Sequence, residues 1–186
     1  FKIPPSWNWY FCKFLMTYKK EIIRSMKLIS KNKKSIFIGQ SVAVPGNLFF
    51  QSLKDVPKNQ KLELPIFEET QMGIAIGLAL NGFLPISCYP RFDFFILSLN
   101  QTVNHIDKLN QISSNEFNPF VIIRVMVGSK KPMNAGMQHT MDYSKELRQM
   151  LKYINVIQLK NSKEVYKSYT KVLKERKNTV FVEYNL

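Results

Sequence analysis

Cysteine is scarce in this sequence of 186 residues. The two cysteines, Cys12 and Cys88, lie far apart, which excludes a disulfide scaffold and a zinc ribbon. This usage fits a reducing compartment, so we expect a cytoplasmic protein. No stretch approaches the roughly 20 apolar residues that a membrane span needs. The aromatic N-terminus has no apolar core followed by a small-residue cleavage site, so no signal peptide is expected.

Common nucleotide-binding and hydrolase motifs are missing as well. The sequence contains no GxxxxGK[ST] P-loop and no GxGxxG after a predicted strand, which disfavours both of these nucleotide-binding folds. No GxSxG elbow supports a serine hydrolase. No spacing of cysteine, histidine and acidic residues indicates a metal site, and none is predicted in this chain.

Acidic residues are outnumbered: 13 Asp and Glu stand against 27 Lys and Arg, a formal net charge of +14. Such a balance raises nucleic acid or an anionic membrane as partners. The lysines are scattered over predicted helices and loops, however, and no helix-turn-helix, zinc-finger or RNP pattern is present. We therefore predict neither a nucleic-acid nor a membrane partner. An acidic partner subunit or a phosphorylated ligand accounts for the charge equally well.

What the sequence does contain is a regular alternation of predicted strands and helices. Helices are predicted over 17–31, 68–80, 93–112, 143–152 and 163–175, and strands over 35–39, 84–89, 119–128, 154–159 and 179–184, with an extended entry at 61–67. This order predicts an α/β fold, a three-layer parallel sheet with helices on both faces. The very apolar 119–128 is expected in the centre. The regular pattern begins at Met16, so we predict an N-terminal extension over 1–15 and one domain over 16–186.

Ligands of such sheets bind beyond the carboxyl ends of the strands. Four stretches are expected at that edge: the turn at Gly39–Gln40, the helix start at Glu68, "YPRF" at 89–92 and the "GMQHT" loop at 136–140. The long irregular loop that contains "GMQHT" itself suggests function. The sequence thus predicts one ligand site built from four separate segments.

Two adjacent acids, Glu68 and Glu69, open the helix at this edge. From spacing alone, the simpler interpretation is that both stabilise the positive end of the helix dipole. The same helix carries Gly73 and Gly77 one turn apart, and each glycine costs about 1 kcal/mol relative to alanine inside a helix. We therefore expect another backbone or another subunit to approach this surface closely.

The aromatic and histidine side chains near the edge leave alternatives open. Phe95 is expected in the core, whereas a phenylalanine at the strand-to-helix junction can also offer its face to a flat heterocycle. His139 lies in the loop at the ligand edge, where it is either incidental or a site residue. His105, in the middle of a helix, is interpreted as a structural or interface residue.

The segments "FIGQSVAVPGN", "PIFEETQMGIAIGLALNGFLPI", "YPRFDFFILSLNQTVNH" and "GMQHT" occur in an order that resembles the pyrimidine-binding domain of thiamine diphosphate enzymes. The resemblance is to the beta subunit of 2-oxo acid dehydrogenase E1 components and, more distantly, to transketolase. It covers about residues 16–186. It implies the thiamin diphosphate-binding fold of the pyrimidine-domain type and an enzyme that cleaves or forms a carbon–carbon bond next to a carbonyl.

The same resemblance implies roles for single residues. Glu68 matches the glutamate that shares a proton with N1′ of the cofactor's aminopyrimidine and so activates the cofactor. Glu69 stays a helix-capping acid. Phe94, with Phe92 close by, matches the aromatic side chain that packs on the pyrimidine ring. His139 matches the loop histidine on the substrate side, where it handles a proton or orients an intermediate.

Two residues depart from the family pattern. Gln40, at a cofactor-binding position, replaces a glutamate that E1 beta chains commonly carry, which puts an acidic proton relay between paired sites in doubt. Arg91 replaces a small polar residue, and an arginine there suits a substrate phosphate or carboxylate.

The sequence also contains no "GDG" followed by asparagine, the motif with which the family binds diphosphate and Mg²⁺, and it ends at "FVEYNL", where the family continues. The resemblance therefore implies activity only with a diphosphate-binding, alpha-type partner subunit that holds most of the Mg²⁺ site, in a heterotetramer. The substrate would be a 2-oxo acid or a ketose phosphate. The alternative is a non-catalytic or regulatory remnant of the domain that acts as an interaction module.

Overall fold

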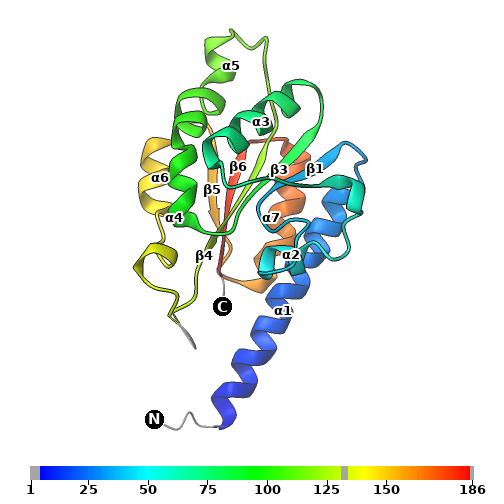
Figure 1. The fold of residues 1–186 in the computed structure, drawn as a ribbon, viewed down its shortest axis with the longest axis vertical. Coiled ribbons are helices and arrows are strands. Elements are labelled where there is room, and N and C mark those ends of the chain that lie inside the picture. Colours follow the sequence, from blue (N-terminus) through cyan, green and yellow to red (C-terminus); the bar gives the residue numbers. More distant parts are fainter. Residues whose placement is uncertain (1–4, 131–133, 185–186) are drawn as a thin grey trace.

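The computed structural model describes residues 5–130 and 134–184, with side chains described from Thr17 onward. Its six strands form one parallel sheet in the order β2-β1-β3-β4-β6-β5. Figure 1 shows this sheet between its covering helices. The strands are β1 (Ser35–Gly39), β2 (Lys61–Glu63), β3 (Leu84–Tyr89), β4 (Ile122–Val127), β5 (Asn155–Gln158) and β6 (Thr179–Tyr184). The α/β class and the central place of β4 are confirmed, because β4 pairs with β3 on one side and β6 on the other.

Helices cover both faces of the sheet. They are α1 (Pro5–Ser30), α2 (Leu48–Ser52), α3 (Glu68–Leu80), α4 (Phe92–Phe95), α5 (Leu109–Ile112), α6 (Ser144–Met150) and α7 (Ser162–Glu175). Helix α1 begins at Pro5, earlier than the expected start near residue 17. The boundary at Met16 stays a prediction, since side chains before Thr17 lie outside the described residues. No helix in the described part of the chain combines the length and apolarity needed to cross a membrane.

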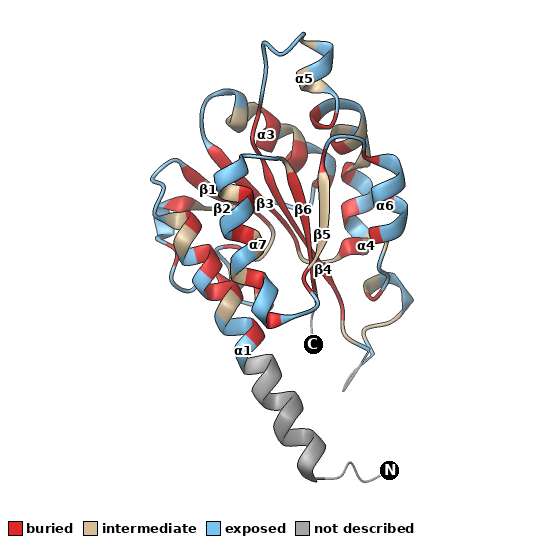
Figure 2. Ribbon diagram, turned by 180° about the vertical axis from the view of Figure 1, so that it is seen from behind, coloured by how far each residue is buried: buried red, intermediate tan, exposed pale blue. Residues whose placement is uncertain are grey.

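Strand β4 explains why the sheet needs a cover on both sides. All six of its side chains are buried, as the red strands of Figure 2 show. Ile122 and Met126 face the helices α1, α2 and α7, whereas Ile123, Val125 and Val127 face α3, α4 and α6. This alternation is the period of two expected for a strand between two apolar layers.

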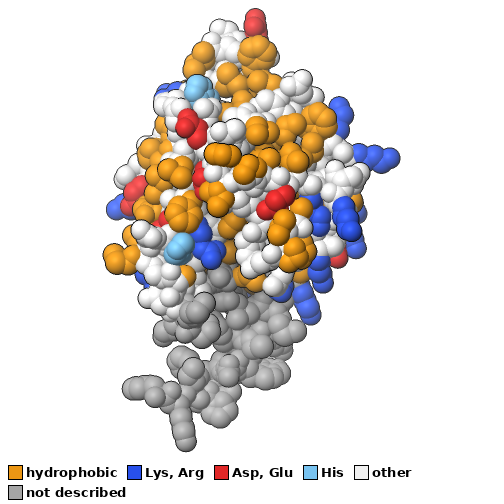
Figure 3. Space-filling model, viewed as in Figure 1, with side chains coloured by type: hydrophobic (Ala, Val, Ile, Leu, Met, Phe, Trp, Pro, Cys, Tyr) orange, Lys and Arg blue, Asp and Glu red, His pale blue; other side chains and the backbone are white. Residues whose placement is uncertain are grey.

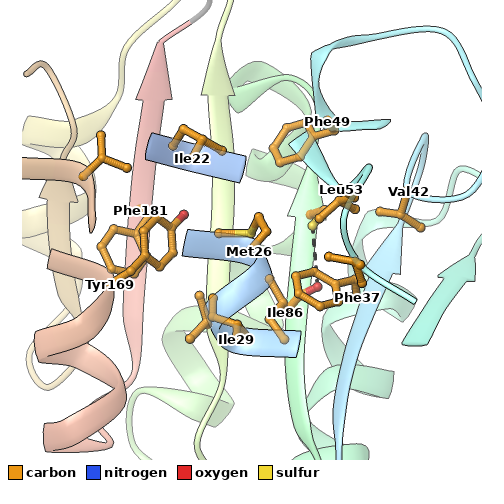
Figure 4. Close-up of a cluster of buried hydrophobic side chains, with 14 of the residues drawn as sticks. Ile22, Met26, Ile29, Phe37, Val42, Phe49, Leu53, Ile86, Tyr169 and Phe181 are labelled. Carbon is orange, nitrogen blue, oxygen red and sulfur yellow. Dashed lines mark hydrogen bonds between the residues drawn. The ribbon is translucent and has the colours of Figure 1, made fainter. Parts of the chain in front are cut away.

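The layer of α1, α2 and α7 packs on the first face. Ile22, Met26 and Ile29 of α1 recur at helical spacing and are buried against β1, β3 and β6 (Figure 4). Tyr169 of α7 stacks on Phe181 of β6, with ring centroids 3.9 Å apart. Helices α1 and α7 lie side by side in this layer (Figure 1).

This layer encloses a buried ion pair that the sequence analysis did not identify. Arg124 of β4 donates from Nε and Nη2 to the two carboxylate oxygens of Glu183 of β6, at 2.7 and 2.8 Å. Tyr169 donates to the same carboxylate at 2.6 Å, and Ser52 of α2 accepts from Arg124 at 3.1 Å. Burial opposes the charge, but Glu183 holds the pKa of the Arg124 guanidinium above its usual value.

The predicted helix 93–112 is wrong as a single regular helix. It divides into α4, a 3₁₀ turn (Ile96–Ser98), a π-helix η3 (Asn100–Ile106) and α5. Asp107 explains the break before α5, because its buried carboxylate accepts backbone N–H bonds from residues 152–154 at 2.8–3.0 Å. The hydroxyls of Ser98 and Thr102 bond to carbonyls of the preceding turn, which loosens regular helix geometry. The expected core position of Phe95 is confirmed, and Ile106 is buried with it.

Candidate active site at the carboxyl edge of the sheet

A pocket of about 560 Å³ lies beyond the carboxyl ends of β1 and β3. All four segments that the sequence placed at this edge contribute to its lining. The lining residues are Gln40, Ser41, Asn47, Ile66, Glu68, Tyr89, Pro90, Arg91, Phe94, Leu97 and His139. Five of the six predicted site residues therefore line one pocket, and Phe92 does not.

Glu68 stands at the first position of α3 and turns its side chain into the pocket. Glu68 is only 5% exposed, although it lies at the start of a helix. The Tyr89 hydroxyl donates to the Glu68 backbone carbonyl at 3.4 Å. Within residues 5–130 and 134–184, the Glu68 carboxylate has no hydrogen bond and no ion pair. A buried carboxylate is costly unless it is paired, so this group fits a ligand that donates a proton or a hydrogen bond.

Glu69 has different surroundings. It is exposed and accepts hydrogen bonds from Asn100 Nδ2 at 2.9 Å and Gln101 Nε2 at 3.5 Å. These bonds from η3 lower the pKa of the Glu69 carboxyl. The two adjacent acids are thus divided: one lines the pocket and the other fastens α3 to the neighbouring helix.

Gln71 fixes α3 to the strands under the pocket. Its buried side-chain amide donates to Ser87 Oγ at 2.9 Å and to the Cys88 carbonyl at 3.0 Å. Gly39, the last residue of β1, has φ +138°, and a Cβ there would lie 2.3 Å from the Cys88 carbonyl oxygen. Only glycine therefore lets β1 and β3 come together at this point. The sequence analysis missed Gln71; a polar residue one turn after Glu68 on a buried helix face was the available signal.

The wall between Gln40 and Asn47 is held by a carboxylate on β2. Glu63 accepts the backbone N–H groups of residues 41–44, with distances of 2.5–3.2 Å. Asn47 caps α2 by accepting from Phe49 N at 2.9 Å and also lines the pocket. Gln40 Nε2 is buried and has no partner among the described residues. An ordered loop therefore presents an unpaired N–H donor at the pocket.

Phe94 and His139 form the opposite wall. Their rings meet edge to face, with centroids 5.5 Å apart and an angle of 77° between the planes. The Nδ1 atom of His139 is buried and without a partner in the described part of the chain. Gly128 brings the histidine loop onto the end of β4, because its N–H donates to the His139 carbonyl at 3.1 Å and a Cβ would lie 2.1 Å from that oxygen.

The remaining predicted residues differ in position. Arg91 lines the pocket at the start of α4, donates to the Pro90 carbonyl at 2.8 Å and has no acidic partner among the described residues. Phe92 is 1% exposed and packs edge to face on Tyr143, at 5.6 Å, behind the pocket. Phe92 therefore belongs to the core and not to the lining of the pocket. No group of three or more potential metal ligands occurs in the part of the chain that the structure describes.

The fold places the chain in a defined structural class. It matches a transketolase from Leishmania mexicana over 89% of this chain and 25% of that one, with a TM-score of 0.67 and 17% identity. It also matches a split-gene transketolase described as an inactive beta4 tetramer, over 90% of this chain and 49% of that one, with a TM-score of 0.57 and 14% identity. The fold is that of transketolase-like, thiamine diphosphate-dependent enzymes.

The curated proteins with similar sequences are beta subunits of dehydrogenases. The chain is 30% identical over 131 residues to the pyruvate dehydrogenase E1 component subunit beta of Cyanidium caldarium, covering 67% of this chain and 37% of the relative. It is 28% identical over 100 residues to the 3-methyl-2-oxobutanoate dehydrogenase subunit beta of Mycobacterium tuberculosis, covering 52% and 29%. The chain spans about a third of the length of these relatives. No family model matches. The chain resembles the pyrimidine-binding domain of E1 beta subunits.

Proposed function

We propose that this chain is the pyrimidine-binding part of a thiamine diphosphate-dependent enzyme and that Glu68 activates the cofactor. The observation that carries the proposal is the Glu68 carboxylate, buried in an open pocket and unpaired within the described residues. An acid that only stabilises the helix start does not have to be buried. The neighbouring Glu69, which is exposed and hydrogen-bonded to Asn100, is an acid of that kind. The relatives support the proposal, because they are the beta subunits of a pyruvate dehydrogenase E1 component and of a 3-methyl-2-oxobutanoate dehydrogenase.

The pocket fits an aminopyrimidine ring. Such a ring is flat and apolar on its faces and carries hydrogen-bonding nitrogens on its edge. Phe94, 41% exposed, and Leu97 offer apolar surface, while Glu68 accepts at the edge and Gln40 Nε2 is a buried donor without a partner. An unpaired buried donor and an unpaired carboxylate that line one cavity indicate a polar ligand that satisfies both.

When bound, thiamine diphosphate would supply a carbon nucleophile that attacks the substrate carbonyl. In this proposal the residues of this chain bind the pyrimidine ring, orient it and handle protons. Glu68 holds or shares the proton at the ring nitrogen, where its carboxyl group acts as a general acid–base. Phe94 packs on the ring. His139, with an unpaired Nδ1 at the pocket, moves or holds a proton on the substrate side.

Arg91 provides the cation of the pocket. Because no acid neutralises it within the described residues, its guanidinium is available to a substrate carboxylate or phosphate. This suits the two substrate classes of the proposal, a 2-oxo acid and a ketose phosphate. A diphosphate-binding chain is proposed to complete the site and to hold Mg²⁺, in a heterotetramer.

The surface of α3 fits such an assembly. Gly73 and Gly77 leave room on the helix, since a Cβ on Gly77 would meet nothing within 4 Å. Apolar side chains gather on the face of the molecule that Figure 3 shows. The large exposed apolar residues of α3, of α4 and of the segments next to them are Ile66, Phe67, Ile74, Leu80, Phe94, Ile96 and Leu97. An apolar patch with close-approach glycines is typical of a surface that packs on another chain.

Partner capture and reconstitution test the proposed function. A tagged chain is purified from its native source, co-purified chains are identified by mass spectrometry, and the pair is assayed with thiamine diphosphate and Mg²⁺ on 2-oxo acids and ketose phosphates. A partner with the "GDG" and downstream asparagine motif that restores cofactor-dependent turnover supports the proposal. A complex that assembles but never turns over either class of substrate contradicts it and favours the non-catalytic module.

A further inference from the structure

The charge of the chain is concentrated on the outer surface of α1 and α7. The described residues of α1 and α7, with the turns 31–34 and 176–177 and Lys160, hold fourteen cations and three glutamates, a net +11. The cations are Lys19, Lys20, Arg24, Lys27, Lys31, Lys33, Lys34, Lys160, Lys163, Lys167, Lys171, Lys174, Arg176 and Lys177, and all fourteen are exposed. The other described residues hold ten cations and ten acids and are neutral overall.

The cations follow helical spacing on both helices. On α1 and the turn after it they recur at residues 20, 24, 27 and 31, and on α7 at residues 163, 167, 171 and 174. Residues three or four apart lie on one helix face, so each series forms a row about 16 Å long. Both helices lead directly into strands of the parallel sheet and therefore run in the same direction. Two similar rows of positive charge thus lie side by side, and a hollow of about 600 Å³ lies along α7 beside Lys167 and Lys171.

These rows destabilise the helices that carry them. Like charges four residues apart, such as Lys163 with Lys167, repel each other. Few acids relieve the repulsion: one ion pair, Lys171 with Glu175 at 3.8 Å, is found on α7 in the described chain. Charge needed only for solubility works as well when it is dispersed over the surface. A concentrated, unneutralised surface instead indicates an anionic partner.

The residues favour an acidic protein over nucleic acid or a membrane. Both arginines of the layer are engaged, Arg24 over the Tyr166 ring at 3.8 Å and Arg176 over Phe120 at 5.2 Å, so the free cations are lysines. Lysine lacks the planar fork that makes arginine common in phosphate recognition. No large exposed apolar or aromatic side chain lies on α1 or α7 among the described residues, which removes a base-stacking platform and a membrane-inserting face. A second copy of this surface is excluded by its own charge.

We propose that the exposed face of α1 and α7 is a docking surface for an acidic helical segment of a partner protein, with Glu or Asp at every third or fourth residue. Such a segment presents a row of carboxylates that matches the rows of lysines in spacing and length. The surface is separate from the candidate site, since the pocket lies at the carboxyl edge of the sheet and no residue of α1 or α7 lines it. Its partner can bind while the pocket and the α3 face are in use.

Charge reversal with a matched control tests the surface. The full chain is prepared in three forms: unmodified, with Lys163→Glu, Lys167→Glu and Lys174→Glu on α7, and with Lys108→Glu, Lys145→Glu and Lys152→Glu in the other layer. All six lysines are exposed, and the two variants change the net charge equally. Far-UV circular dichroism and melting curves establish that both variants fold. The probe is a fluorescein-labelled helical peptide of glutamate and alanine, followed by fluorescence anisotropy at about 150 mM salt.

The proposal expects the α7 variant to bind the acidic peptide about tenfold more weakly and the control variant to bind within about twofold of the unmodified chain. Equal loss in both variants, or no binding by the unmodified chain, overturns it. A 20-base-pair DNA duplex and vesicles containing phosphatidylserine are titrated in parallel. If either binds the unmodified chain more tightly than the peptide does and loses affinity in the α7 variant, the partner is a nucleic acid or a membrane and the proposal fails.

Discussion

The rings of Phe94 and His139 meet edge to face at the pocket, with ring centroids 5.5 Å apart. The two side chains come from segments more than 40 residues apart in the sequence and are brought together by the carboxyl ends of β3 and β4. Behind them, the buried Glu68 carboxylate lines the same cavity. The contact therefore joins the proposed cofactor side of the pocket to its proposed substrate side.

Phe94→Ala tests the proposed packing on the pyrimidine ring. Phe94 is 41% exposed, so its loss should change the stability of the fold little. Aromatic packing contributes about 0.5–1.5 kcal/mol beyond burial, so we expect about tenfold weaker affinity for thiamine diphosphate in the reconstituted complex. Phe117→Ala, at an equally exposed position outside the pocket, is the control. Equal cofactor affinity in the two variants would remove Phe94 from the site.

Gly39→Ala tests how tightly β1 and β3 are joined beneath the pocket. The new Cβ would lie 2.3 Å from the Cys88 carbonyl oxygen at φ +138°, so strand or helix must shift. We expect a loss of about 2–4 kcal/mol in the free energy of unfolding, measured with urea. Gly77→Ala is the matched control, because nothing lies within 4 Å of its added Cβ; a gain of up to about 1 kcal/mol in the isolated chain is expected. A Gly39→Ala chain as stable as the unmodified chain contradicts this geometry.

Arg124→Met tests the buried ion pair. The substitution leaves the Glu183 carboxylate buried with Tyr169 as its remaining donor, and breaking such a pair costs about 3–5 kcal/mol. The double variant Arg124→Met/Glu183→Leu removes both charges and should recover a large part of the loss. Urea unfolding of the two single variants and the double variant gives the coupling energy. Additive losses would show that the two side chains do not act as a pair.

Asp142 should make the fold sensitive to acid. Burial raises its pKa, but hydrogen bonds from Ser144, Tyr184 and Gln158 outweigh burial and lower the pKa below the ordinary value of 3.8. A carboxyl with a depressed folded pKa stabilises the fold above its unfolded pKa and loses that contribution as pH falls through the folded value. Because Asp142 is partly exposed, we expect about 1 kcal/mol.

Unfolding of Asp142→Asn and the unmodified chain is compared between pH 7 and pH 2. The difference in the free energy of unfolding should be constant at neutral pH and shrink below about pH 4. Tyr184→Phe removes one donor at 2.8 Å and should reproduce part of the effect. A difference that is independent of pH down to pH 2 would contradict the depressed pKa.

The sequence predicts the sheet well, because periodicity and strand–helix alternation are local properties of the chain. It also places four of the pocket's segments at one edge, since that follows from parallel strands alone. The break in the helix at Asp107 could not be predicted from local sequence, because the hydrogen-bond partners of Asp107 lie 45–47 residues further along the chain. The pairing of Arg124 with Glu183, 59 residues apart, depends in the same way on the order of β4 and β6 in the sheet. The difference between Glu68 and Glu69 likewise depends on where η3 packs.

The most direct measurement of the central claim is turnover by the reconstituted complex with Glu68→Gln and, separately, Glu69→Gln. Each variant replaces a carboxylate by an amide of the same size, and assembly is verified by size-exclusion chromatography. Loss of the proton-sharing carboxyl at Glu68 should lower kcat by about 10²–10⁴-fold, while Glu69→Gln stays within about twofold. Normal turnover by an assembled Glu68→Gln complex, or an equal loss in both variants, would contradict the account.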